Sequence, residues 1–154
     1  MEIEHTTGDR FYFAYGSNMD SRQMRVRCRG AYFVGVARLR DFEFRINRRG
    51  VATIVQRDRS DVYGVLWKIS QPDERSLDAY EGVLYGTYEK RFVEVETGPH
   101  NLVRALAYVA RDSSRGVPRP DYLERIVTAA KEHQLPARYV ETLDRWERQV
   151  RTAS

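Results

Sequence analysis

The sequence predicts one α+β domain, a small β-barrel with helices packed on it. Before residue 112, short apolar or alternating runs follow one another between turn residues, which is typical of a barrel or a strongly curled sheet. After a linker at residues 112–120, apolar residues recur at helical spacing instead. A chain of 154 residues can bury a core without disulfides or metals, so residues 1–154 are expected to form a single domain.

Six or seven runs are expected to form the strands of this barrel. Residues 11–15 are nearly all apolar, as in a strand that is covered on both faces. In residues 62–69 the apolar side chains Tyr63, Val65 and Trp67 alternate with other residues and share one face. The full set is residues 11–15, 31–36, 42–46, 51–55, 62–69, 88–96 and 102–110.

Two helices are expected to interrupt the strands. Asn18 or Asp20 can cap a short arginine-rich helix over residues 21–28. A second helix has Pro72 in its first turn and runs to about Tyr80, and Gly82 stops it.

Two more helices are expected after the linker, with a break at Pro136. The first carries an apolar stripe from Tyr122 to Ala130 at helical spacing. The stripe of the second is formed by Tyr139, Leu143, Trp146 and Val150. If apolar residues on this last helix are exposed, they could form the interface of a homodimer.

The composition argues against membrane, secreted and disordered classes. It is 42% hydrophobic and 31% charged, as in folded proteins, and there is no apolar run of roughly twenty residues that could span a membrane. Residues 1–5 are acidic and lack the apolar core of a secretory signal. The single cysteine, Cys28, cannot form an internal disulfide, so a cytoplasmic location is the default expectation.

The net charge of +4 does not by itself indicate a nucleic-acid partner. Only three of the 26 basic residues are lysine, and an arginine excess can suit phosphate. The arginine-rich helix at residues 21–28 would be the place for such binding. Acidic residues are interleaved with the arginines elsewhere, so no nucleic-acid partner is expected.

The turn Tyr15-Gly16-Ser17-Asn18 is the first candidate site. Successive backbone N–H groups after a strand can form an anion-binding concavity, although Gly, Ser and Asn are also common in ordinary turns. Ser17 is a weak candidate nucleophile, because no histidine is evidently placed to activate it.

Glu81 is the second candidate, since it ends an amphipathic segment just before Gly82. Such a glutamate is often merely solvated. Its neighbours are nevertheless apolar, and burial among them would raise its pKa toward the working pH. These neighbours are Leu77, Tyr80, Val83, Leu84 and Tyr85. Asp78 could pair with Glu81, but it is expected to serve structure as a hydrogen-bond acceptor.

Other reactive residue types give weaker signals. His5, His100 and His133 are scattered, so no metal site is expected. Cys28 lies among arginines, which would favour a thiolate, although a lone cysteine more often only packs. Tyr88, Tyr108 and Tyr122 are candidates to line a pocket with hydroxyl groups.

Several separated segments together resemble the γ-glutamylcyclotransferase family, which includes AIG2-like and γ-glutamylamine cyclotransferase-related proteins. They occur in the family's order and extend from about residue 11 to the last helices. The segments are Phe-Ala-Tyr-Gly-Ser-Asn-Met at residues 13–19, then residues 36–42, 50–54, 62–67 and 77–83, with Tyr88 downstream.

The resemblance implies a compact mixed barrel whose cavity binds a γ-glutamyl group. In the implied reaction the α-amine of the substrate attacks its own γ-carbonyl, releasing 5-oxoproline and a free amine or amino acid. No cofactor or metal is needed, and Glu81 carries over as the general acid/base. The implied substrate-binding residues are Tyr15, Gly16, Ser17, Asn18, Tyr88 and Tyr122.

The resemblance says less about the leaving group. Relatives act on γ-glutamyl amino acids, on γ-glutamyl amines, or on a γ-glutamyl protecting group in antibiotic biosynthesis. The segment from Gly86 and the loop at residues 112–120 would shape this side of the cavity. The match over residues 36–42 and 50–54 favours γ-glutamyl amino acids. A binding module without catalysis is the rival hypothesis, but such a module would not need Glu81 in an apolar pocket.

Overall fold

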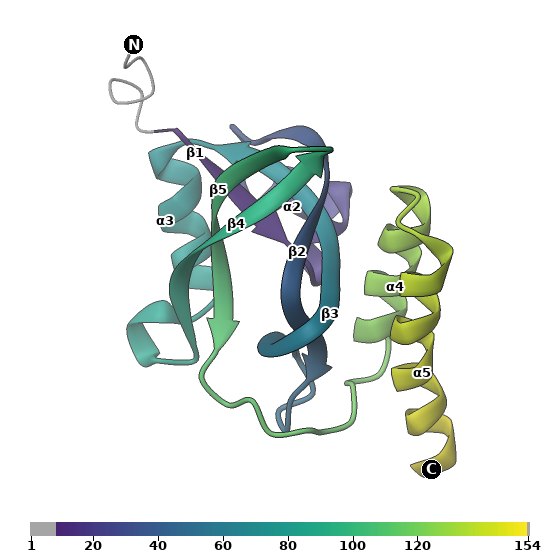
Figure 1. The fold of residues 1–154 in the computed structure, drawn as a ribbon. Helices are drawn as coiled ribbons and strands as arrows, with labels where there is room; N and C mark the ends of the chain where they lie inside the picture. Colours follow the sequence, from purple (N-terminus) through teal and green to yellow (C-terminus); the bar gives the residue numbers. More distant parts are fainter. Residues whose placement is uncertain (1–8, 154) are drawn as a thin grey trace.

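A closed five-stranded barrel forms the centre of the computed structural model, which describes residues 9–153 and the side chains of residues 9–146. Neighbouring strands follow the order β1-β3-β2-β4-β5 (Figure 1). All pairs are antiparallel except β1 and β5, which run parallel and close the barrel. The strands are β1 (Arg10–Ala14), β2 (Tyr32–Ile46), β3 (Ala52–Ile69), β4 (Tyr88–Gly98) and β5 (Asn101–Ala110). The prediction of a mixed barrel with packed helices is confirmed.

The prediction of six or seven short strands is wrong, because two pairs of runs are continuous. β2 joins the runs at residues 31–36 and 42–46, and β3 joins those at residues 51–55 and 62–69. The polar residues 56–59 are exposed, yet the strand continues through them. Gln56 pairs with Phe42 of β2, and residues 57–59 lie where the register between the two strands shifts. A register shift beside Asp41, whose carboxylate accepts the Arg59 N–H at 3.0 Å, bends the long hairpin without ending it. Polar residues here mark an exposed strand, not a break.

All four predicted helices are present, and residues 9–153 also contain two short 3₁₀ turns. Figure 1 shows α3 on one side of the barrel and the pair α4 and α5 on the other. The bounds are α2 (Ser21–Arg27), α3 (Gln71–Tyr80), α4 (Tyr122–Glu132) and α5 (Ala137–Ala153), with 3₁₀ turns η1 (Ser17–Met19) and η2 (Val83–Tyr85). No helix among the described residues is both long enough and apolar enough to cross a membrane.

Side chains at the helix starts explain where the helices begin. Asp20, not Asn18, caps α2 by accepting the Arg22 N–H at 3.0 Å. At α3, Ser70 and Asp73 form a reciprocal capping box. The Asp73 carboxylate also accepts the Gly30 N–H at 3.2 Å, which ties α3 to the segment that leads into β2. The start of α3 is therefore held in a defined place beside the barrel.

The apolar stripes of α4 and α5 are buried against the rest of the chain. Ile126 and Leu143 are fully buried. The described apolar side chains of the α5 stripe, Tyr139, Leu143 and Trp146, are covered by the chain itself, while that of Val150 lies outside the described residues. These side chains do not supply an exposed face for a homodimer, and the homodimer stays a prediction.

Candidate active site

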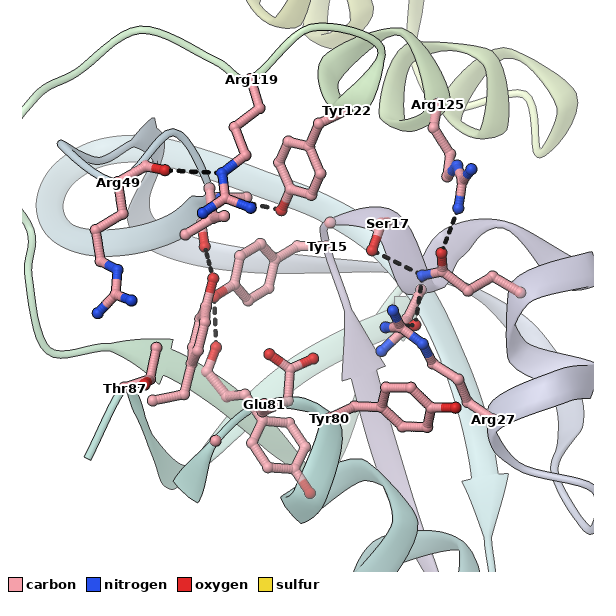
Figure 2. Close-up of a pocket in the computed structure, with 18 of the residues that line it drawn as sticks. Tyr15, Ser17, Arg27, Arg49, Tyr80, Glu81, Thr87, Arg119, Tyr122 and Arg125 are labelled. Atoms are coloured by element: carbon pink, nitrogen blue, oxygen red, sulfur yellow. Dashed lines mark hydrogen bonds between the residues drawn. The ribbon is translucent and has the colours of Figure 1, made fainter. Parts of the chain in front are cut away.

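A cavity of about 570 Å³ opens at one end of the barrel, where β1 and β5 end and β3 and β4 begin (Figure 2). The segment that leads from β5 to α4 passes along the same end. Every residue predicted for the site lines this cavity. These residues are Tyr15, Gly16, Ser17, Asn18, Glu81, Tyr88 and Tyr122.

The Gly-Ser-Asn turn forms one wall of the cavity. Ser17 and Asn18 begin the 3₁₀ turn η1, and the first N–H groups of such a turn have no acceptor within it. The Ser17 hydroxyl accepts a hydrogen bond from Gln23 Nε2 at 2.7 Å. No histidine is among the described residues that line the cavity, and the hydrogen bond of the Ser17 hydroxyl goes to an amide and not to a base, so the geometry does not favour Ser17 as a nucleophile.

The side chain of Asn18 is buried and organises the same wall. Its amide nitrogen donates to the Tyr12 hydroxyl at 2.9 Å, and its oxygen accepts from Gln23 at 2.9 Å and from Arg27 at 3.0 Å. The Arg27 guanidinium also lies over the Tyr80 ring, 4.4 Å from its centroid. Asn18 thus fixes a positive charge beside the turn, a role that the sequence did not indicate.

Glu81 lies at the C-terminal end of α3, and its carboxylate projects toward the centre of the cavity (Figure 2). Its N–H still donates to Leu77 O at 2.8 Å, and Gly82 then takes a φ of +66°, which favours glycine. Within residues 9–153 no hydrogen bond reaches this carboxylate. Burial raises its pKa from 4.5 to about 7, and the nearby Arg27 charge opposes that rise. Glu81 can therefore take or give a proton near neutral pH.

The surroundings of Glu81 match the neighbours that the sequence indicated only in part: Leu77 is fully buried, whereas Tyr80, Leu84 and Tyr85 are exposed. Leu84 and Tyr85 are 88% and 87% exposed, because η2 directs them away from the cavity. Four tyrosines from other elements enclose the carboxylate instead, and its charge helps to raise the pKa of each. They are Tyr12, Tyr15, Tyr88 and Tyr122. The raised pKa of Glu81 was expected, and its cause is burial in a cavity to whose lining these tyrosines contribute.

Tyr88 and Tyr122 bind the two polar groups of Ala52. The Tyr88 hydroxyl donates to Ala52 O at 2.7 Å. The Tyr122 hydroxyl accepts from Ala52 N at 3.0 Å, so its own proton is left to donate into the cavity. Tyr15, which also lines the cavity, donates its hydroxyl proton to Tyr108 O.

Replacing Tyr122 by Phe is expected to lower the free energy of unfolding by about 1–3 kcal/mol, because the buried Ala52 N–H loses its acceptor. Urea unfolding monitored by circular dichroism measures this change. Tyr85→Phe is the matched control, since Tyr85 is 87% exposed. Equal stability of the two variants would contradict the role of this hydrogen bond.

Asp78 serves structure, as expected, and does not line the cavity. Its carboxylate accepts from the Tyr108 hydroxyl at 2.6 Å and from Lys90 Nζ at 3.0 Å. Lys90 in turn binds Glu74, one turn earlier on α3. This network joins α3 to β4 and β5, and so supports the helix end that carries Glu81.

Four arginines line the cavity that were not predicted as site residues: Arg27, Arg49, Arg119 and Arg125. In the part of the chain that the structure describes, none of them forms an ion pair with a carboxylate. Tyr12 and Gln23 were also missed. Only Arg27 lies in a segment that the sequence marked as arginine-rich. The cavity wall is strongly positive, which suits an anionic ligand.

Cys28 is a packing residue. It is buried beside Asp73, whose backbone oxygen lies 3.7 Å from its sulfur, and burial raises the pKa of its thiol to about 12. The suggestion of a thiolate is therefore wrong. Among the described residues, no three His, Cys, Asp or Glu side chains are grouped so that they could hold a metal ion.

Comparison with known proteins gives consistent matches over most of the chain. The AIG2-like family model matches residues 61–143. The γ-glutamylcyclotransferase of Homo sapiens is 35% identical over 142 residues, which are 86% of this chain and 76% of the relative. That of Bos taurus is 32% identical over 93% of this chain and 82% of the relative. A solved structure described as a γ-glutamyl cyclotransferase has a TM-score of 0.82 and 34% identity, covering 88% of this chain and 86% of its own.

Proposed function

Because the chain belongs to the AIG2-like family and is an enzyme of the γ-glutamylcyclotransferase kind, we propose that it converts a γ-glutamyl amino acid or γ-glutamyl amine to 5-oxoproline and the free amine. The single observation that carries this proposal is Glu81. Its carboxyl group projects into an anion-attracting cavity and has a pKa of about 7, raised by burial. No part of the proposal requires a cofactor.

In the proposed reaction the nucleophile and the electrophile belong to one molecule. Glu81 takes a proton from the α-ammonium of the substrate, and the amine nitrogen attacks the γ-carbonyl carbon. A C–N bond forms and closes a five-membered ring, and the carbonyl oxygen becomes an oxyanion. Glu81 then gives its proton to the leaving nitrogen as the original amide C–N bond breaks and the oxyanion returns to a carbonyl. The ring nitrogen releases its second proton to Glu81, which passes it to the freed amine. The cavity contributes mainly by holding the folded substrate in an attack geometry.

Hydrogen-bond donors around Glu81 are suited to the negative charges of the substrate and of the oxyanion. The N–H groups of Ser17 and Asn18 and the free hydroxyl proton of Tyr122 can receive a carboxylate or the developing oxyanion. The Tyr12 hydroxyl accepts from Asn18 and likewise keeps its own proton for a ligand. Arg27 and Arg125 lie on the same side as the Ser17 turn and favour the α-carboxylate of the γ-glutamyl half.

Incubation of the purified protein with γ-glutamyl dipeptides and a γ-glutamyl amine tests the proposal, with 5-oxoproline measured by mass spectrometry. We expect 5-oxoproline and the free amine in equal amounts. Free glutamate in place of 5-oxoproline would indicate hydrolysis by water and would overturn the intramolecular mechanism.

The pH dependence follows from the pKa of Glu81. The free enzyme must hold Glu81 as the carboxylate to accept the ammonium proton, and burial places that ionisation at about 7. We therefore expect kcat/KM to rise about tenfold for each pH unit below 7 and to level off above it. Initial rates at constant ionic strength from pH 5 to 8 measure this. A profile that is already flat at pH 5.5 would show that the required base has an ordinary carboxyl pKa.

A further inference from the structure

Two of the cavity arginines, Arg49 and Arg119, lie apart from the Ser17 turn and close to each other. Arg119 Nε donates to Arg49 O at 3.1 Å. Figure 2 shows them on the side of Thr87 and Tyr122, whereas Arg27 and Arg125 lie on the side of Ser17. The cavity therefore has two positive walls with Glu81 between them.

The backbone that carries Arg49 and Arg119 is firmly held. The side chain of the fully buried Asn47 accepts the Arg49 N–H at 3.0 Å and donates to Asp112 O at 2.8 Å. The Arg119 N–H donates to Gly50 O at 3.2 Å. Gly50 has a φ of +83°, and a Cβ there would lie 2.7 Å from Arg119 Cγ, so glycine lets the two segments pack directly. The turn after β2 and the segment before α4 thus present both arginines from one packed unit.

Neither guanidinium is paired with a carboxylate of the described chain, although the charge of Arg49 helps to lower the pKa of Asp112. Within the described residues, neither Arg49 nor Arg119 forms an ion pair, and the only acidic residues that line the cavity are Glu81 and Asp121. Exposed arginines are often simply solvated. Here, however, two of them face one cavity on the side opposite the turn proposed to hold the γ-glutamyl half. They are therefore placed to bind the leaving amino acid or amine of the substrate.

We propose that Arg49 and Arg119 bind two carboxylates of the leaving group, so that the preferred substrate is a γ-glutamyl peptide of an acidic amino acid. This inference rests on the proposed function and specifies its substrate class. A neutral leaving amino acid presents one carboxylate, and aspartate or glutamate presents two, which matches two guanidinium groups. Arginine suits this task because its planar donors pair with a carboxylate in a fixed geometry.

The direct test compares kcat/KM for γ-glutamyl-glutamate and γ-glutamyl-glutamine, which differ in one charge at nearly equal size. We expect the glutamate peptide to be preferred about tenfold or more at low salt, and the preference to shrink as NaCl is raised. Turnover of both peptides without this preference would overturn the inference and leave the proposed function standing. If neither they nor other γ-glutamyl compounds yield 5-oxoproline, the proposed function itself fails.

Variants test whether Arg49 and Arg119 cause the preference for the glutamate peptide. Arg49→Gln combined with Arg119→Gln is expected to bring the ratio of the two kcat/KM values close to one, mainly by raising KM for the glutamate peptide. Arg48→Gln is the matched control, because Arg48 is exposed on the same turn but does not line the cavity, and it should keep the wild-type ratio. Arg119→Lys keeps the charge and should keep most of the preference even if the double variant folds poorly. A wild-type ratio in the folded double variant, or loss of the ratio in Arg48→Gln, would overturn the assignment.

Discussion

Replacing Glu81 by Gln is expected to abolish turnover while leaving the fold intact. Glutamine has nearly the same size but cannot exchange a proton, so the α-ammonium stays protonated and the leaving nitrogen receives no proton. Loss of a positioned acid/base costs about a hundred- to ten-thousand-fold in rate, and one residue supplies both steps here. A continuous 5-oxoproline assay measures the loss. Activity within tenfold of wild type would remove Glu81 from the mechanism.

The same variant should be more stable than wild type above neutral pH, which provides an independent check that it folds. The pKa of Glu81 is raised from 4.5 to about 7 in the folded chain, so the folded state binds this proton more tightly than the unfolded state. The stability of the wild-type protein therefore falls as pH rises from about 4.5 to about 7, by up to about 3 kcal/mol for this group. Thermal unfolding should show a large gap between the variant and wild type at pH 8 and only a small one at pH 5.

Replacing Gly64 by Ala is expected to cause a large loss of stability. A Cβ at this position would lie 2.3 Å from Ala14 O and 2.9 Å from Phe13 Cε1. Since β3 pairs with β1 here, the added methyl group meets backbone that cannot rotate away. Overpacking of this kind costs about 1–3 kcal/mol and more when backbone must move, so we expect a loss of about 3 kcal/mol or more. For a chain of this length that lowers Tm by about 6–12 °C.

Gly35→Ala is the matched control for this prediction. Gly35 lies on β2, which also pairs with β3, and a Cβ there has no heavy atom within 4 Å. We expect its Tm to stay within a few degrees of wild type. If both variants lose the same stability, the cause is the general effect of replacing glycine in this sheet and not the contact between β3 and β1.

How much of the site could be predicted depended on how local its signals are. The Gly16-Ser17-Asn18 turn and Glu81 were candidates because each lies where a strand or helix ends, and the family resemblance then assigned them, with Tyr122 at the start of α4, to one site. The structure brings all of them to one cavity. Their roles in binding and catalysis are the proposals that the variants above test.

The parts that could not be predicted depend on contacts between distant segments. Asn18 reads as a helix cap, but its side chain is turned inward to Tyr12 and Arg27, which no spacing reveals. Leu84 reads as a buried neighbour of Glu81, but η2 leaves it exposed. The loop at residues 112–120 was expected beside the cavity, but its packing on the turn at Gly50, which brings Arg119 into the lining, was not predictable. Periodicity predicts the elements, whereas the path of the chain between them decides which side chains meet.

The parallel pairing of β1 with β5 has a consequence for how the chain acquires its site during synthesis. Phe11 pairs with Ala105, and the cavity is lined by residues from Tyr12 to Arg125. A nascent chain on the ribosome therefore has no complete cavity until α4 has emerged and the ring of strands has closed. A ligand of this cavity binds only the finished barrel, and so it stabilises the whole fold against global unfolding, with no partly built segment to recognise.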